Sequence, residues 1–216
     1  MTLGRIALSS LIAVLTLAFS SPADAWDGER KGFLIALGAG IGFTSTAQTK
    51  PFVDDGSGRV RGFDPPRDFS PLIGGDFQIG YAPNNNFDLF LFTNNSWMDI
   101  NIIDPAVVPT ATIASFTLTQ LNGVGLTYYR KQTFLPSAPA GFVTAGIGVG
   151  VVRPSTSSSL PTRYGPGLTF GGGYEFKKHI RTKLAFTYIN ASKKFSGESF
   201  SVIPWSVKLT IGIIGY

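Results

Sequence analysis

The chain has 216 residues, enough for one domain or two small ones, and 14% of them are charged, against about 25% in a typical soluble domain. It contains no cysteine, which excludes a disulfide framework, a thiolate metal site and cysteine catalysis. The formal net charge is +5, but the lysines and arginines are scattered. A nucleic-acid-binding face needs a basic stripe on one element, so we predict no nucleic-acid partner.

Residues 1–25 have the pattern of a secretory signal peptide. Arg5 precedes an apolar run over residues 6–19, and a small-x-small cleavage motif stands at residues 23–25. A membrane-anchoring helix is the competing interpretation, but the apolar run is shorter than the roughly 20 residues that cross a bilayer. We therefore expect cleavage between Ala25 and Trp26 and export of the remaining chain.

The first strand pattern covers residues 33–43. Phe33 and Phe43 bracket one face of alternating apolar side chains, as aromatic residues do at the two interfaces of a membrane barrel. Leu34 apart, the opposite face carries only small residues, which suits a narrow barrel interior. The segment is also long enough for a tilted membrane strand, which needs about 9 to 11 residues.

Further segments alternate in the same way and are predicted as strands. They cover residues 73–81, 87–97, 115–129, 141–151, 168–176, 184–188 and 205–216. In segment 115–129, Gln120 and Asn122 share the phase of the apolar residues, and we expect a bulge near Asn122-Gly123 to turn them inward. The Asn-Gly pair also permits a hairpin, but its two halves would be too short to cross a bilayer.

Long and short connections mainly alternate between these strands. The long ones cover residues 45–70, 98–112, 153–165 and 190–199, the short ones 82–86 and 177–179, and one of intermediate length covers 130–140. An even number of strands with the long loops on one side is typical of membrane barrels. We predict an all-β fold, an eight-stranded antiparallel up-and-down transmembrane β-barrel over residues 26–216. A soluble eight-stranded barrel would expose the glycine-rich face to water with too little charge.

The last strand has the clearest pattern. From Trp205 to Ile213 every second side chain is large and apolar, but Ile214 and Tyr216 fall out of phase, and a bulge near Gly212 to Gly215 would return Tyr216 to the outer face. The aromatic residues expected at the membrane interfaces are Phe33, Phe43, Tyr81, Tyr188, Trp205 and Tyr216.

These features together resemble one superfamily. The secretory signal, the eight-strand rhythm, the segments G-F-V-T-A-G-I-G-V-G and Y-G-P-G-L-T-F-G-G-G-Y-E-F, and the aromatic C-terminus look like the small OmpA-like and OmpW-like outer-membrane barrels of Gram-negative bacteria. The resemblance covers the whole mature chain. It implies a place in the bacterial outer membrane with periplasmic termini, and insertion by the barrel-assembly machinery through the C-terminal strand. Basic strand ends would meet lipopolysaccharide phosphates, and the long loops would offer surfaces for ligands.

Charged residues on the inward phases are the candidates for a lumen site. They are Asp76, Glu175, Lys183 and Lys208. Opposite charges inside a narrow barrel should pair and plug it, because an unpaired charge there is costly. A narrow polar pore is the alternative. Phe90, Phe92 and Phe142 would fill the core, or line a path for a hydrophobic ligand.

No residue pattern indicates catalysis. The single histidine, His179, lies in the basic turn K-K-H-I-R, where a general base would lack a nucleophile and an orienting carboxylate. The acidic segment at residues 54–58 lacks the ligand spacing of a calcium loop. We therefore expect no catalytic, cofactor or metal site. The functional hypotheses are a structural and surface-interaction barrel, a narrow channel for small or hydrophobic solutes, and a lipid-modifying enzyme.

Overall fold

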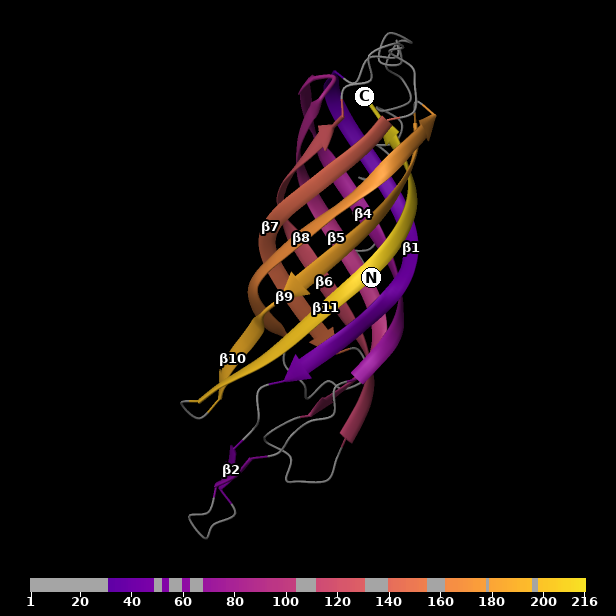
Figure 1. Cartoon of the computed structure of the whole chain (residues 1–216). Helices are drawn as coiled ribbons and strands as arrows, with labels where there is room; N and C mark the ends of the chain where they lie inside the picture. The colour runs from indigo at the N-terminus through magenta and orange to yellow at the C-terminus, as the bar shows by residue number, and fades with distance from the viewer. Residues whose placement is uncertain are drawn as a thin grey trace, which may run out of the picture.

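The chain folds into a β-barrel (Figure 1). The computed structural model describes residues 31–48, 52–54, 60–62, 68–103, 112–130, 140–154, 162–177, 179–195 and 198–216. The strands are β1 (Gly32–Gln48), β2 (Phe52–Asp54), β3 (Val60–Gly62), β4 (Asp68–Asn84), β5 (Phe87–Ile103), β6 (Thr112–Tyr129), β7 (Ala140–Pro154), β8 (Arg163–Lys177), β9 (Ile180–Ile189), β10 (Ala191–Phe195) and β11 (Glu198–Gly215). Within these residues there is no helix long and apolar enough to span a membrane.

The sheet closes because β1 pairs antiparallel with both β4 and β11. β9 and β10 are two parts of one wall strand, since both pair with β11 and both pair with β8. The nine-stranded sheet is therefore an eight-stranded barrel, and the predicted fold is confirmed. The partners of Ile35, followed once around the wall, lead back to β1 at Ser45, ten residues further on. Such a stagger tilts the strands by roughly 40°.

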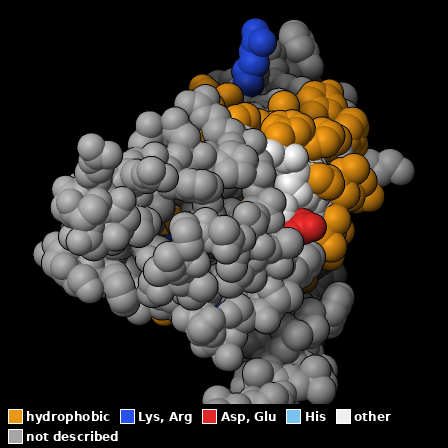
Figure 2. Space-filling view, turned by 90° about the horizontal axis from the view of Figure 1, so that it is seen from below, with side chains coloured by type: hydrophobic (Ala, Val, Ile, Leu, Met, Phe, Trp, Pro, Cys, Tyr) orange, Lys and Arg blue, Asp and Glu red, His pale blue; other side chains and the backbone are white. Residues whose placement is uncertain are grey.

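Side chains alternate between the two faces of the wall as the pattern predicts. On β1, Phe33, Ile41 and Phe43 are exposed on the outside, and Leu34 and Thr44 are buried inside. Figure 2 views the molecule from the end at which β1 finishes and shows hydrophobic side chains along the part of the outer wall that is visible there. In water such a surface would drive aggregation, whereas in a bilayer it meets lipid chains.

Several strands are longer than predicted. Both ends of the connection predicted at 45–70 belong to β1 and β4, and the β2–β3 hairpin lies between them. The first residues of the connection predicted at 98–112 belong to β5. The connection at 153–165 is shortened by β7 and β8, and 190–199 is mostly β10 and the start of β11. These boundaries were wrong because they followed the alternation of large apolar residues, whereas the backbone pairing continues beyond it.

Two predicted bulges are absent. The register of β6 is continuous with both β5 and β7, so Gln120 and Asn122 keep the outward phase. The register of β1 with β11 is continuous to Gly215, so Ile214 is buried inside with 1% of its surface exposed. Unbroken pairing keeps the backbone hydrogen-bond ladder of these strands continuous at the two positions, where a bulge would interrupt it.

Local chemistry explains the short turn and the break in the wall. At the β4–β5 turn the Asn84 Oδ1 accepts hydrogen bonds from the backbone N–H groups of Asn86 (2.9 Å) and Phe87 (3.1 Å), a common device of asparagine in turns. At the break between β9 and β10, the N–H of Asn190 donates to the carbonyl of Pro166 over 2.9 Å. Pro166 has no N–H to continue the ladder, so the pairing is interrupted there.

The direction of the strands places both described turns and the C-terminus at one end of the barrel (Figure 1). The strand ends that flank residues 49–67, 104–111, 155–161 and 196–197 lie at the other end. The expected cleavage site between Ala25 and Trp26, and the middle of connection 130–140, lie outside the described residues.

Candidate functional site

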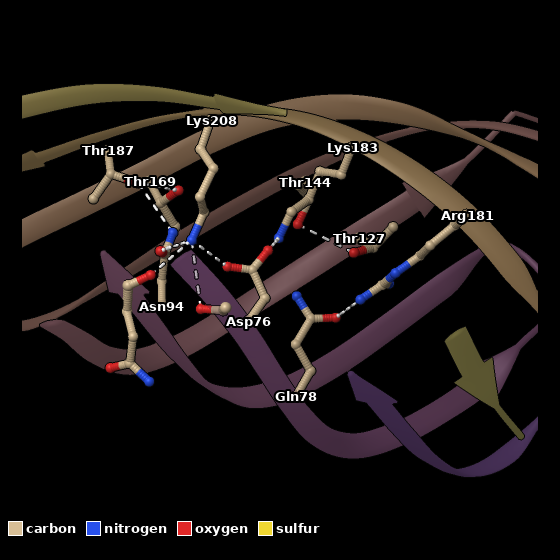
Figure 3. A network of polar contacts seen from close by, with 12 residues as sticks. Asp76, Gln78, Asn94, Thr127, Thr144, Thr169, Arg181, Lys183, Thr187 and Lys208 are labelled. Atoms are coloured by element: carbon tan, nitrogen blue, oxygen red, sulfur yellow. Dashed lines mark hydrogen bonds and ion pairs between the residues drawn. The ribbon is translucent and has the colours of Figure 1, made fainter. Parts of the chain in front are cut away.

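The lumen is crossed by an ion-pair network around Asp76. Lys183 Nζ lies 2.6 Å from Asp76 Oδ2, and Lys208 Nζ lies 2.8 Å from Asp76 Oδ1. The three side chains come from β4, β9 and β11, and all are almost fully buried. In Figure 3 they point toward one another from different parts of the wall. One carboxylate held by two ammonium groups leaves a net positive charge, which neutral acceptors must solvate.

Those acceptors surround Lys208. Its Nζ donates to the side-chain oxygen of Asn94 (2.6 Å) and to the backbone carbonyls of Asn95 (3.0 Å) and Gly75 (3.4 Å). Asn94 in turn donates to Thr187 Oγ1 over 3.1 Å. The network therefore ties β4, β5, β9 and β11 together across the lumen.

Sequence reasoning grouped Glu175 with these charges, but the structure places it elsewhere. Glu175 is buried on β8 and lies opposite Arg181 in the register, toward the short-turn end. Along β8 it stands two residues beyond Gly173, which is the residue opposite Lys183. Arg181, which was not predicted, donates to Gln78 Oε1 over 2.6 Å. Its inward phase was readable only once the start of β9 at Ile180 was known.

Aromatic side chains fill the lumen beside the network. Phe90 and Phe92 meet edge to face with their ring centroids 6.1 Å apart. Phe90 packs where a Cβ on Gly125 would stand, and Phe92 packs where a Cβ on Gly146 would stand. These glycines make room for the rings. The cavity left between the rings, Asp76 and the surrounding residues measures about 10 Å³, which is room for one water molecule at most.

A second cluster closes the lumen at the C-terminal end. Tyr216 is 93% buried (7% exposed), and its hydroxyl lies 2.8 Å from the Tyr129 hydroxyl and donates to Asp88 Oδ2 over 3.4 Å. Tyr216 was predicted at the outer interface, and that prediction is wrong. The register of β1 with β11 is continuous to Gly215, so even-numbered residues face the lumen up to the end of the chain. After Ile213 the large side chains stand at even positions instead of odd ones, and Tyr216 therefore lies inside.

The other predicted interface aromatics lie on the outer wall. Phe33 and Tyr81 are directly opposite each other near the short-turn end, and Tyr188 and Trp205 are opposite each other toward the long-connection end. Phe43, at the same end, stacks on Phe69 with a centroid distance of 5.3 Å. Further outward aromatics that were not predicted complete two belts. They are Phe69, Phe87, Trp97, Tyr128, Tyr164, Tyr174 and Phe176.

His179 is held by the backbone of the last strand. Its Nδ1 lies 2.9 Å from the carbonyl oxygen of Ile214, and its own carbonyl accepts the N–H of Ile214 over 3.0 Å. Among the described residues, no group of three or more His, Asp or Glu side chains is placed to hold a metal ion. The histidine therefore serves to join the β8–β9 turn to β11.

Comparison with known proteins bears on the fold. No family model and no curated protein matches the sequence. Among solved structures, the chain is similar to the outer membrane protein OprG from Pseudomonas aeruginosa, with 16% identity and a TM-score of 0.51, over 87% of this chain and 98% of that one. The chain has the fold of the small outer-membrane β-barrels. It is also similar to Neisserial surface protein A, with 11% identity and a TM-score of 0.48, over 84% of this chain and 96% of that one.

The outer wall and the lumen of this barrel are determined in different ways. The outer wall follows from the architecture, since any such barrel needs an apolar band between aromatic belts. The buried Asp76 network and the contact between Tyr129 and Tyr216 depend on individual residues that face the lumen.

Proposed function

We propose that the protein is a non-enzymatic outer-membrane barrel with a closed lumen, which contributes to envelope integrity and contacts other surfaces through its long connections. The observation that carries this proposal is the Asp76–Lys183–Lys208 network, which together with Phe90 and Phe92 leaves a cavity of only about 10 Å³ at that level. An open channel would need a continuous water-filled path, and side chains fill the interior of an eight-stranded barrel readily.

The proposed location is the bacterial outer membrane, with both termini in the periplasm. The exposed apolar wall between aromatic belts supports a membrane location. The signal pattern at residues 1–25 supports export, and the short turns share the end of the C-terminus, as periplasmic turns do in outer-membrane barrels.

The proposed partners follow from that location. Basic strand ends would meet lipopolysaccharide phosphates, and the last strand would be read by the barrel-assembly machinery. The connections from β1 to β4, β5 to β6, β7 to β8 and β10 to β11 would face outside and offer surfaces to ligands. The bonded state of His179 supports the absence of catalysis, because its Nδ1 already faces a backbone carbonyl. An unchanged lipid A mass spectrum after deletion of the gene is expected, whereas loss of a lipid A modification would favour the enzyme hypothesis.

Ion conductance of the folded protein in planar bilayers tests the closed lumen. We expect no steady current, while a general porin inserted in the same way conducts. A triple variant, Asp76→Ala with Lys183→Ala and Lys208→Ala, should gain a current, because it shortens the three side chains that cross the lumen. A steady open current from the unaltered protein would overturn the proposal in favour of a narrow channel for small or hydrophobic solutes.

A further inference from the structure

Four uncharged polar side chains form a patch on the outer wall. They are Thr93 and Asn95 on β5, and Gln120 and Asn122 on β6, and we refer to them as the amide patch. Thr93 is opposite Asn122 in the register, and Asn95 is opposite Gln120. All four lie on the outward phase and are only half-buried, beside exposed Leu91 and Val124 and among the residues that face lipid.

The depth of the patch follows from the strand geometry. Asn122 lies six residues from Tyr128, which belongs to the aromatic belt at the short-turn end. At about 2.5 Å of height per residue in a tilted strand, this separation is roughly 15 Å, within an apolar band about 25 Å tall. Trp97, two residues beyond Asn95, marks the other belt. The patch therefore lies in the hydrocarbon, between the bilayer midplane and the long-connection end.

Some polar groups of the amide patch take no part in the hydrogen bonds within it. Asn122 Oδ1 accepts from Thr93 Oγ1 over 2.8 Å and from Gln120 Nε2 over 2.9 Å. The Nδ2 donors of Asn122, the Oε1 acceptor of Gln120 and the whole side-chain amide of Asn95 make no hydrogen bond with the described part of the chain. Hydrocarbon has no group to satisfy them, and an unmet amide in an apolar medium is costly.

The patch is also unlike the rest of the wall. Among the described outward positions between the two aromatic belts, side-chain amides occur only here; the remainder are mainly Val, Leu, Ile and Phe. On the neighbouring strand, the residue opposite Asn95 is Gly75, and the residue opposite Gly75 is Ala39. In contacts between transmembrane helices, small residues let the backbones approach closely and polar side chains bond across the contact. Gly75 and Ala39 leave similar room beside the amides.

We propose that the amide patch is the interface with a second copy of this chain, related by a two-fold axis along the membrane normal. Such an axis brings equal depths together, so the amides of one copy meet those of the other. Each amide carries both donors and an acceptor, and the patch is therefore complementary to itself, as a two-fold interface requires. Lipid ester groups lie near the belt and would reach Gln120, but Asn122 is deeper. The proposal rests on the membrane location proposed above.

Disulfide cross-linking in lipid tests the interface, since the native chain has no cysteine. Val124→Cys places a thiol two residues from Asn122 and leaves the patch intact. Leu209→Cys, on the opposite wall and similarly exposed, is the matched control. In phosphatidylcholine vesicles under mild oxidation, we expect covalent dimers from Val124→Cys and not from Leu209→Cys. No dimer at Val124→Cys, or equal dimer at both, would overturn the proposal.

A second variant separates the interface from simple proximity. It carries Val124→Cys together with Asn95→Leu, Gln120→Leu and Asn122→Leu. Its cross-linked fraction should be about tenfold lower than that of Val124→Cys alone. Unchanged cross-linking would contradict the role of the amides. If no dimers form, and if lipopolysaccharide stabilises the protein but not the variant with the three leucines, the patch would be assigned to lipid binding. Heat-dependent gel migration confirms folding in each case. Its absence from the unaltered protein would count against the membrane barrel itself and not against the interface.

Discussion

At the scale of single residues, Lys208 holds the lumen together. It has 2% of its surface exposed and bonds to Asp76, Asn94 and two backbone carbonyls. Lys208→Met keeps the length of the side chain but leaves the carboxylate with one cationic partner and Asn94 with an empty acceptor. We expect the free energy of unfolding to fall by about 3 kcal/mol, measured by urea titration in lipid vesicles. The exposed Lys31→Met is the control, and equal effects of the two changes would contradict the network.

Tyr216 provides a second test at this scale. If its hydroxyl bonds to Tyr129 and Asp88 in the lumen, Tyr216→Phe should cost about 1 kcal/mol of unfolding free energy. Tyr128→Phe changes an exposed phenol on the outer belt and should cost less. A larger effect at Tyr128 than at Tyr216 would favour the outward placement of the final residue. The urea titration used for Lys208 also serves here.

At the scale of the strands, closure depends on how closely β1 approaches β11. A Cβ on Gly42 would collide with the backbone carbonyl of Val207 and the Cα of Lys208, neither of which can rotate away. Gly42→Ala should therefore lower the unfolding free energy by about 1 to 3 kcal/mol. Gly141 has no neighbour within 4 Å of the corresponding position, so Gly141→Ala should fold as the native chain does. Thermal unfolding followed by gel migration compares the two, and equal melting would refute the tight seam.

The strand pattern predicts on which face of the wall a side chain lies, but not which side chains lie close together. Alternation alone places Asp76, Lys183 and Lys208 on inward phases, since a side chain on a strand has only two faces. It does not reveal that Glu175 lies at another level, or that Asn94 bonds to Lys208 from 114 positions away, because those facts depend on the stagger of the whole barrel. The phase of Asn94 was readable from Phe90 and Phe92, but an amide carries no charge to draw attention.

Asn122 and Tyr216 were assigned to the wrong face of the wall for the same reason. A bulge was expected near Asn122, where a polar residue fell on the outer phase, and before Tyr216, where the final aromatic residue fell on the inner one. The pairing instead stays regular, and the residues find partners where they are: the Asn122 oxygen within the amide patch, and Tyr216 at Tyr129. Backbone pairing in a membrane wall outweighs the preference of a single side chain, so polar residues out of pattern are better interpreted as sites than as bulges.

At the scale of the whole molecule, one layer of backbone separates two environments. Outside, exposed Leu, Ile, Val and Phe side chains lie between two aromatic belts. Inside, charged and hydroxyl groups bond to one another across a filled lumen (Figure 3). The consecutive residues Ile213 and Ile214 report on both, because the first is 59% exposed and the second 1% exposed.

Methyl NMR of the native protein in lipid nanodiscs tests this arrangement without a substitution. The Ile213 methyl groups should show nuclear Overhauser effects to lipid acyl chains, as should those of Ile211 and Leu209. The Ile214 methyl groups should show none to lipid and none to water, since they lie in a filled lumen. Lipid contacts at Ile214, or water contacts at Ile213 in place of lipid, would contradict the barrel described here.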